Sequence, residues 1–213
     1  MIKTILKYKY LYLGGFLKLI RKRNSFLYAT GWDKSFKEGK PLDNTGNFVP
    51  WMNYPIIGFL KERLRPDLTL FEFGSGYSTL FYAPRVKSVT AVEYDHKWYQ
   101  WITGAAPDNV ETLFKEKDED GFYAQSISER SEKCDVIVVD GADRRNCLKY
   151  SVESLSDKGV IILDDSHRER YAEAIGILRA KGFRVLHFEG LKPCGYKMYR
   201  ASIFYRSNNC FEI

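Results

Sequence analysis

Leu-Thr-Leu-Phe-Glu-Phe-Gly-Ser-Gly-Tyr-Ser, residues 68–78, is the stretch that decides the fold of this chain. Its first part, Leu68–Phe73, has the length and the apolar composition of a buried strand. Gly74-Ser75-Gly76 follows, where a backbone without Cβ atoms can turn sharply and approach a ligand closely. Tyr77–Tyr82 then predicts the first turns of a helix that Pro84 ends. A strand, a glycine turn and a helix in this order place backbone N–H groups beside a crevice at the carboxyl end of a sheet.

Glu72 is the acidic residue inside this otherwise apolar strand. A buried carboxylate is costly unless it is paired, so the sequence predicts a cationic or hydrogen-bonding partner for it. A Gly-x-Gly turn alone fits a plain loop as well as a ligand site. The choice between the two therefore depends on residues further along the chain.

From Leu68 onward, apolar runs alternate with helical segments, which predicts an α/β fold with an open, mostly parallel sheet and helices on both faces. Ligands of such sheets bind outside the carboxyl ends of the strands. The expected strands are 68–73, 88–93, 110–114, 135–140, 159–163, 183–189 and 201–206. The expected helices are 77–82, 96–103, 121–131, 144–155 and 168–181.

The basic residues are concentrated at the N-terminus. Residues 1–40 contain ten Lys and Arg against two acidic residues, whereas the rest of the chain contains 23 against 25. The net charge of +6 therefore gives little support to nucleic-acid binding by the main domain. We expect a basic helical and lid-like extension over residues 1–66 and a ligand-binding domain over residues 67–213.

Residues 1–23 mix aromatic and aliphatic residues with Lys and Arg, and two interpretations remain open. In one, a basic aromatic helix contacts an anionic membrane face. In the other, the helix packs on the domain with a solvated basic side, which Gly14-Gly15 favours because glycine weakens a continuous amphipathic helix. The longest uncharged stretch, Tyr10–Leu17, is far shorter than the ~20 residues of a spanning helix.

The four cysteines have no zinc-type spacing, and no secretory signal accompanies them, so we expect reduced thiols in a cytoplasmic protein. They are Cys134, Cys147, Cys194 and Cys210.

Three further strands end in acidic residues. Glu93 follows Val89-Thr90-Ala91-Val92, Asp140 follows Val136–Val139, and the pair Asp164-Asp165 follows Val160–Leu163. Because parallel strands end at the same edge of a sheet, these carboxylates are predicted to line one rim together with Glu72.

This set of residues resembles the class I S-adenosylmethionine-dependent methyltransferases over roughly residues 68–206. Glu72, Gly74, Ser75 and Gly76 are similar to that family's acid-x-Gly-x-Gly motif, Glu93 to its ribose-binding acid, and Asp140 to its fourth-strand acid. The resemblance implies a Rossmann-like seven-stranded sheet of order 3-2-1-4-5-7-6 with strand 7 antiparallel. It also implies S-adenosylmethionine as the cofactor, with Glu72 near the ammonium and Ser78 near the carboxylate of its amino-acid tail.

An NAD-dependent oxidoreductase is the competing interpretation within the same fold class. The third glycine of the dinucleotide fingerprint would fall at Thr79, where glycine is absent. This departure favours the methyltransferase.

The second half of the chain is similar to the cation-dependent O-methyltransferases of the catechol and caffeoyl-CoA type. That likeness implies a divalent metal ion, expected to be Mg²⁺, that is bound by Asp140, Asp164 and Asp165. Two departures are visible: Asp165 replaces the asparagine of those enzymes, and their lysine near the fourth-strand acid is not found at Asp143. The C-terminal part, from Asp164 to Arg206, also resembles uncharacterised bacterial methyltransferases found with polysaccharide-synthesis genes.

The expected function is therefore methyl transfer, directed to a hydroxyl group of a small-molecule or glycan-type acceptor. A hydroxyl nucleophile must lose its proton, and His167, Asp140 and Asp164 are the candidate bases. The alternative from another class is a membrane-peripheral binding or scaffold protein that keeps the fold without turnover.

Overall fold

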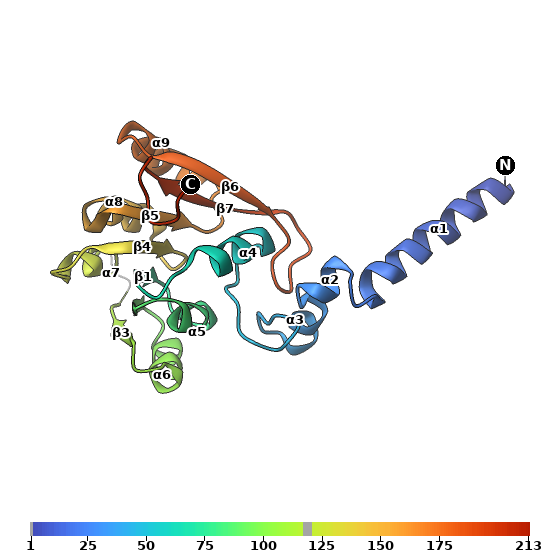
Figure 1. The fold of residues 1–213 in the computed structure, drawn as a ribbon, viewed down its shortest axis with the longest axis horizontal. Coiled ribbons are helices and arrows are strands. Elements are labelled where there is room, and N and C mark those ends of the chain that lie inside the picture. Colours follow the sequence, from blue (N-terminus) through green and yellow to red (C-terminus); the bar gives the residue numbers. More distant parts are fainter. Residues whose placement is uncertain (1, 117–120) are drawn as a thin grey trace.

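Seven strands hydrogen-bond into one sheet of order β3-β2-β1-β4-β5-β7-β6 (Figure 1). β1 to β5 run parallel to their neighbours, and β7 is antiparallel to both β5 and β6. This computed structural model describes residues 2–116 and 121–213, and it confirms the fold and the strand order. The strands are β1 Thr69–Phe73, β2 Ser88–Glu93, β3 Val110–Phe114, β4 Cys134–Val139, β5 Leu155–Leu163, β6 Arg184–Gly190 and β7 Tyr199–Tyr205.

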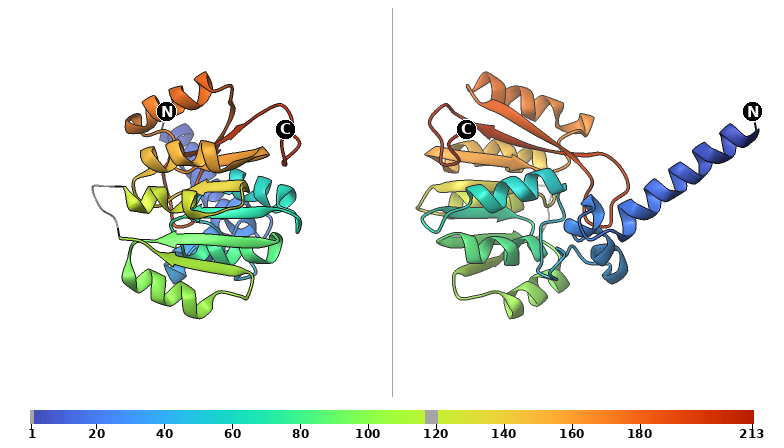
Figure 2. Two further views of the ribbon diagram at one scale, coloured as in Figure 1. Left: turned by 90° about the vertical axis from the view of Figure 1, so that its left-hand side faces the viewer. Right: turned by 45° about the vertical axis from the view of Figure 1, so that its right-hand side comes forward.

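Helices cover both faces of this sheet (Figure 2). The α-helices of the described part of the chain are α1 Ile2–Arg21, α2 Phe26–Ala29, α3 Trp32–Glu38, α4 Tyr54–Arg63, α5 Tyr77–Tyr82, α6 His96–Ala105, α7 Phe122–Gln125, α8 Arg144–Ser154 and α9 Ala172–Ala180. Shorter 3₁₀ turns are η1 Ala83–Arg85, η2 Ser126–Glu129 and η3 Glu169–Tyr171.

Alternate residues of the central strands enter two separate cores, as the two-residue period of a strand requires. One core joins Leu70, Val136 and Val160 to α4 and α5. The other joins Phe71, Ile137 and their neighbours to α7, α8 and α9. The central strands are therefore buried on both faces, which explains their continuous apolar runs.

α4 belongs to the first core, although it precedes the sheet in the sequence. Ile56 and Leu60 are fully buried there, and Phe59 packs 5.0 Å from Phe188 of β6, measured between ring centroids. α4 therefore packs with the sheet, and the division of the chain at residue 66 stays a prediction.

The predicted helix 121–131 is replaced by α7 and η2. The hydroxyl of Ser126 donates a hydrogen bond to the carbonyl of Tyr123 at 2.7 Å, a local bond that competes with continuation of the helix. Among the residues that the structure describes, no helix is long and apolar enough to cross a membrane.

Candidate functional site

The glycine turn after β1 forms the floor of the site. Gly74 has a positive φ of 92°, and its N–H donates to the carbonyl of Val92 at 2.9 Å. A Cβ at Gly74 would lie 2.8 Å from the Cα of Gly141, which follows β4. Because the two backbones touch, only glycine fits at this contact, and the turns after β1 and β4 become one surface.

Glu72 lies behind this floor and is completely buried. Its carboxylate accepts hydrogen bonds from the hydroxyls of Ser78 and Thr79, both in the first turn of α5. Burial raises the pKa of Glu72 to about 8, against the lowering effect of these two hydroxyl donors. Thr79 also accepts from the N–H of Gly76 at 3.0 Å. The hydrogen-bonding partner predicted for Glu72 is thus a pair of hydroxyls. Thr79, which stands where a dinucleotide fingerprint has its third glycine, stabilises the turn through its bonds to Glu72 and Gly76.

Glu93, at the end of β2, connects two turns through its carboxylate. One oxygen accepts from the N–H of Ser75 at 2.8 Å, and the other accepts from the N–H groups of Tyr94 and Asp95, each at 2.9 Å. Asp95 in turn caps α6 by accepting from the N–H of Trp98 at 3.0 Å. The acid predicted to bind ribose therefore also fixes the loops around it.

A cavity of about 400 Å³ opens above these turns. It includes five of the predicted cofactor-binding residues, while Glu72 and Gly76 lie outside its lining. Residues to which the sequence analysis assigned no role also line the cavity, among them Asp95, Trp98 of α6, and Arg144 of α8. The lining residues are Gly74, Ser75, Ser78, Glu93, Tyr94, Asp95, Trp98, Asp140, Gly141, Ala142 and Arg144.

Arg144 joins the ends of β4 and β5. Its guanidinium lies 2.8 Å from the carboxylate of Asp140. It also donates to the backbone carbonyls of Asp140, Gly141 and Asp164 at 2.5, 3.0 and 2.7 Å. Arg144 begins α8 only four residues after Asp140, and this short separation in the sequence was the signal that could have revealed it.

Lys192 reaches the acidic pair after β5 from the loop between β6 and β7. Its buried ammonium donates to Asp164 Oδ2 at 2.5 Å and to Asp165 Oδ1 at 2.7 Å. Asp165 also forms an ion pair with Arg168. Nothing in the local sequence pattern indicates this contact, because Lys192 lies 28 positions after Asp164.

The two acids of this pair differ in their electrostatics. Burial raises the pKa of Asp164, assisted by the negative charge of Asp140 and opposed by Lys192. Burial acts on Asp165 too, but the hydrogen bond and charge of Lys192, with the charge of Arg168, hold its pKa below the usual value. Asp164 Oδ1 is buried and has no hydrogen-bond partner among the residues that the structure describes. Asp164 is therefore the member of the pair that is better suited to take up a proton.

The loop that carries Lys192 is held by the segment before the sheet. The indole N–H of Trp51 donates to the carbonyl of Pro193 at 2.9 Å, and that of Trp32 to Gly195 at 2.7 Å. The N–H of Tyr54 donates to Leu191 at 2.9 Å. These bonds fix the position of Lys192 over the ends of the strands.

Asp140, Asp164 and Asp165 lie at one rim, as predicted, but they do not form the predicted magnesium site. Across residues 2–116 and 121–213, no three His, Cys, Asp or Glu side chains are grouped to hold a metal ion. Lys192 and Arg144 supply the positive charge that a divalent cation would bring. The side chains present therefore do not fit Mg²⁺.

His167, the other candidate base, is exposed. Its ring lies 6.5 Å from that of Tyr199, and the Tyr199 ring lies 4.9 Å from the ammonium of Lys192. His167 thus flanks the acidic pair from outside, and its role stays a prediction.

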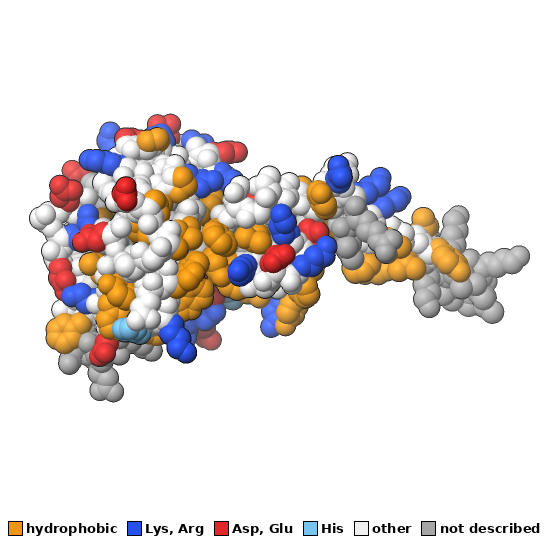
Figure 3. All heavy atoms as spheres, turned by 90° about the horizontal axis from the view of Figure 1, so that it is seen from below, with side chains coloured by type: hydrophobic (Ala, Val, Ile, Leu, Met, Phe, Trp, Pro, Cys, Tyr) orange, Lys and Arg blue, Asp and Glu red, His pale blue; other side chains and the backbone are white. Residues whose placement is uncertain are grey.

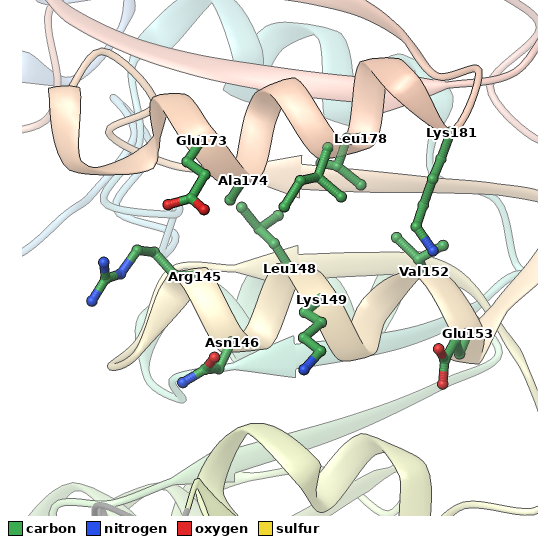
Figure 4. A pocket seen from close by; sticks show the side chains of 11 residues that line it. Arg145, Asn146, Leu148, Lys149, Val152, Glu153, Glu173, Ala174, Leu178 and Lys181 are labelled. Carbon is green, nitrogen blue, oxygen red and sulfur yellow. The ribbon is translucent and has the colours of Figure 1, made fainter.

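A second cavity, of about 520 Å³, lies between α8 and α9 (Figure 4). Charged side chains, including Arg145, Lys149 and Glu173, surround an apolar floor around Leu148 and Leu178. None of the predicted site residues lines it. The glycine turn and the strand ends contribute to the cavity of about 400 Å³, which is the candidate site.

Comparison with solved structures identifies the fold as that of the S-adenosylmethionine-dependent methyltransferases. No family model and no curated protein gives a significant match. A candidate O-methyltransferase from Klebsiella pneumoniae matches with a TM-score of 0.54 and 16% identity, over 92% of this chain and 96% of that chain.

Two precorrin enzymes match over a shorter part of this chain. Precorrin-6y C5,15-methyltransferase from Geobacter metallireducens matches with a TM-score of 0.51 and 16% identity, over 72% of this chain and 87% of that chain. A precorrin 8w decarboxylase from Methanobacterium thermoautotrophicum matches with a TM-score of 0.50 and 20% identity, over 71% and 87%. Likeness at this identity establishes the fold, and the activity has to be argued from the site.

Proposed function

We propose that this protein transfers the methyl group of S-adenosylmethionine to a hydroxyl group of a small-molecule or glycan-type acceptor. The observation that carries the proposal is the cavity of about 400 Å³ at the strand ends. Its walls combine a glycine turn, serine hydroxyls and carboxylates beside the pair formed by Lys192 and Asp164.

The lining of the cavity suits the separate parts of this cofactor. Ser75 and Ser78 offer hydroxyls to the amino-acid tail. Glu93 already accepts from backbone amides, but a carboxylate has about four lone-pair sites and can accept from ribose hydroxyls as well. Trp98 offers an aromatic face to the purine. Glu72 acts from behind by orienting Ser78.

The charge of the lining disfavours a dinucleotide. Glu93, Asp95 and Asp140 face the cavity against one cationic residue, Arg144, among those that line it. Such a surface repels a pyrophosphate and attracts a sulfonium and an ammonium group.

Asp164 is the group that we assign as general base. S-Adenosylmethionine supplies a methyl group on a positively charged sulfur. The acceptor oxygen attacks that methyl carbon as the carbon–sulfur bond breaks, and its proton passes to the carboxylate. The raised pKa and the unpartnered Oδ1 of Asp164 suit this step. Lys192 positions Asp164, and holding both reactants aligned supplies ~7–11 kcal/mol of the barrier.

Thermal denaturation with added nucleotides tests the cofactor assignment. S-Adenosylhomocysteine at 100 times its Kd is expected to stabilise the protein by ~2.7 kcal/mol. NAD⁺ under the same conditions is expected to leave the melting temperature unchanged. Stabilisation by NAD⁺ and none by S-adenosylhomocysteine would make the oxidoreductase the better proposal.

Turnover of the Asp164→Asn variant tests the base. We expect kcat to fall by roughly 10²–10⁴-fold, because the amide cannot take up the proton, while the affinity for S-adenosylhomocysteine is retained. His167→Ala is the comparison variant, since His167 is the exposed candidate. A large loss in His167→Ala with normal turnover in Asp164→Asn would transfer the role to the histidine.

A further inference from the structure

α1 does not pack on the sheet domain. It meets α2 at its base and then extends away from the rest of the molecule (Figures 1 and 2). The helix runs continuously through Gly14 and Gly15, and a Cβ added at either glycine would meet nothing within 4 Å. Over the part of α1 that the structure describes, the helix therefore leads away from the domain and does not pack on it.

The exposed side chains of this helix are mostly apolar. Tyr10 is 73% exposed, Tyr12 83%, Leu13 52% and Phe16 52%. Figure 3 shows hydrophobic side chains along the projecting segment. At ~25 cal/mol per Å² of apolar surface, so many aromatic and aliphatic side chains left in water indicate an interaction site.

Helical periodicity arranges these residues on one broad side. Positions 10, 13 and 17 form one stripe, and positions 12, 16 and 19 form the adjacent one, at spacings of three and four residues. Lys18 lies on the other side, next to Leu11 in the helical projection. The described part of α1 therefore presents one broad apolar side, with Lys18 away from it.

The charge of the segment identifies the surface that it fits. Residues 1–32 contain seven Lys and Arg and no acidic residue, whereas residues 41–213 carry a net negative charge. Basic residues near an anionic bilayer each contribute ~1 kcal/mol of attraction. A second copy of the same helix would bring seven like charges together, which disfavours self-association as the way to cover the apolar side.

We infer that α1 binds to the surface of an anionic lipid bilayer, lying in its plane with the side that carries Leu13 and Phe16 inserted. The helix is not apolar enough to span the bilayer, so insertion stops at the interface. Phe26 of α2 and Phe36 of α3, in the two helices that follow α1 in the chain, are also exposed, at 48% and 58%. The inference does not depend on the proposed methyl transfer.

Cosedimentation of the full chain with vesicles tests this inference. We expect binding to phosphatidylcholine vesicles that contain phosphatidylglycerol, loss of binding as the salt concentration rises, and little binding to pure phosphatidylcholine. Equal binding to both kinds of vesicle, or none to either, would overturn it.

A matched pair of variants separates insertion from charge. Leu11→Glu and Phe16→Glu change the net charge equally at two exposed positions on opposite sides of α1. Leu11→Glu is expected to weaken vesicle binding roughly fivefold through charge alone, at ~1 kcal/mol per charge. Phe16→Glu is expected to weaken it at least roughly tenfold further, because its carboxylate would enter the apolar layer.

Equal losses in the two variants would contradict insertion. So would a concentration-dependent dimer in sedimentation equilibrium that Phe16→Glu abolishes, since a second copy would then cover the apolar side. The melting temperature of the domain should be unchanged in both variants, which shows that it remains folded.

Discussion

The two halves of the strand-end rim hold their carboxylates in different ways. On the β1–β2 side, Glu72 and Glu93 are held by neutral hydroxyl and amide donors. On the β4–β5 side, Asp140, Asp164 and Asp165 are held by the cations Arg144 and Lys192. Neutral donors bring no positive charge to Glu93, which suits a cationic cofactor. Cationic partners neutralise the second half, which suits an acceptor whose hydroxyl becomes an anion.

Removal of Lys192, on the β4–β5 side, should have the largest effect on the stability of the protein. We expect Lys192→Met to lower the free energy of unfolding by ~3–5 kcal/mol, because Asp164 and Asp165 stay buried without the ammonium that bridges them. Adding Asp164→Asn to this variant should recover part of the loss. Chemical denaturation measures both changes, with Lys197→Met, an exposed lysine of the same loop, as the control. A loss no larger than that of the control would show that the pair is not needed for stability.

On the β1–β2 side, the buried Glu72 should make the free energy of unfolding depend on pH. Burial raises the pKa of Glu72 to about 8, so the folded state retains a proton that the unfolded state releases at lower pH. Stability should therefore fall as the pH rises from the unfolded pKa toward 8, by at most ~1.4 kcal/mol per pH unit from this residue.

Glu72→Gln removes that titration. Thermal denaturation at several pH values should give a flatter profile for Glu72→Gln than for the native protein across this range. Two profiles with the same slope would show that Glu72 is ionised in the folded protein at neutral pH.

Metal removal should have the smallest effect. Lys192 already bridges Asp164 and Asp165, so EDTA is expected to leave turnover unchanged and Mg²⁺ to leave the melting temperature unchanged. An EDTA-sensitive turnover that Mg²⁺ restores would mean that the second half of the rim rearranges to admit a cation.

Much of the fold follows from short-range patterns in the sequence. Continuous apolar runs predict β1 and β4 within one residue, and β2 and β3 have the predicted bounds, whereas β5 begins at Leu155 and not at the predicted residue 159. The strand order came from the resemblance to methyltransferases. The helix 121–131 was predicted too long because the Ser126 hydroxyl captures a backbone carbonyl, an effect that hydrophobic periodicity does not record.

The site was predictable where its residues follow strand ends, and it was missed where partners arrive from elsewhere. Glu93 and Asp140 are examples of the first kind. Lys192 is of the second kind, since a loop held by Trp32 and Trp51 delivers it. The sequence does not have, at Asp143, the lysine that the cation-dependent O-methyltransferases place near their fourth-strand acid. In the structure, a lysine from a distant part of the chain, Lys192, contacts the acidic pair after β5.

Calorimetric titration with S-adenosylhomocysteine tests the central claim, that the strand-end cavity binds this cofactor. Trp98 and Trp101 are equally exposed on α6, at 39% and 38%, but only Trp98 is among the residues that line the cavity. We expect binding by the native protein, a loss of roughly tenfold in Trp98→Ala at ~1–3 kcal/mol per stacked base, and little change in Trp101→Ala. No binding by the native protein, or equal losses in both variants, would contradict the claim.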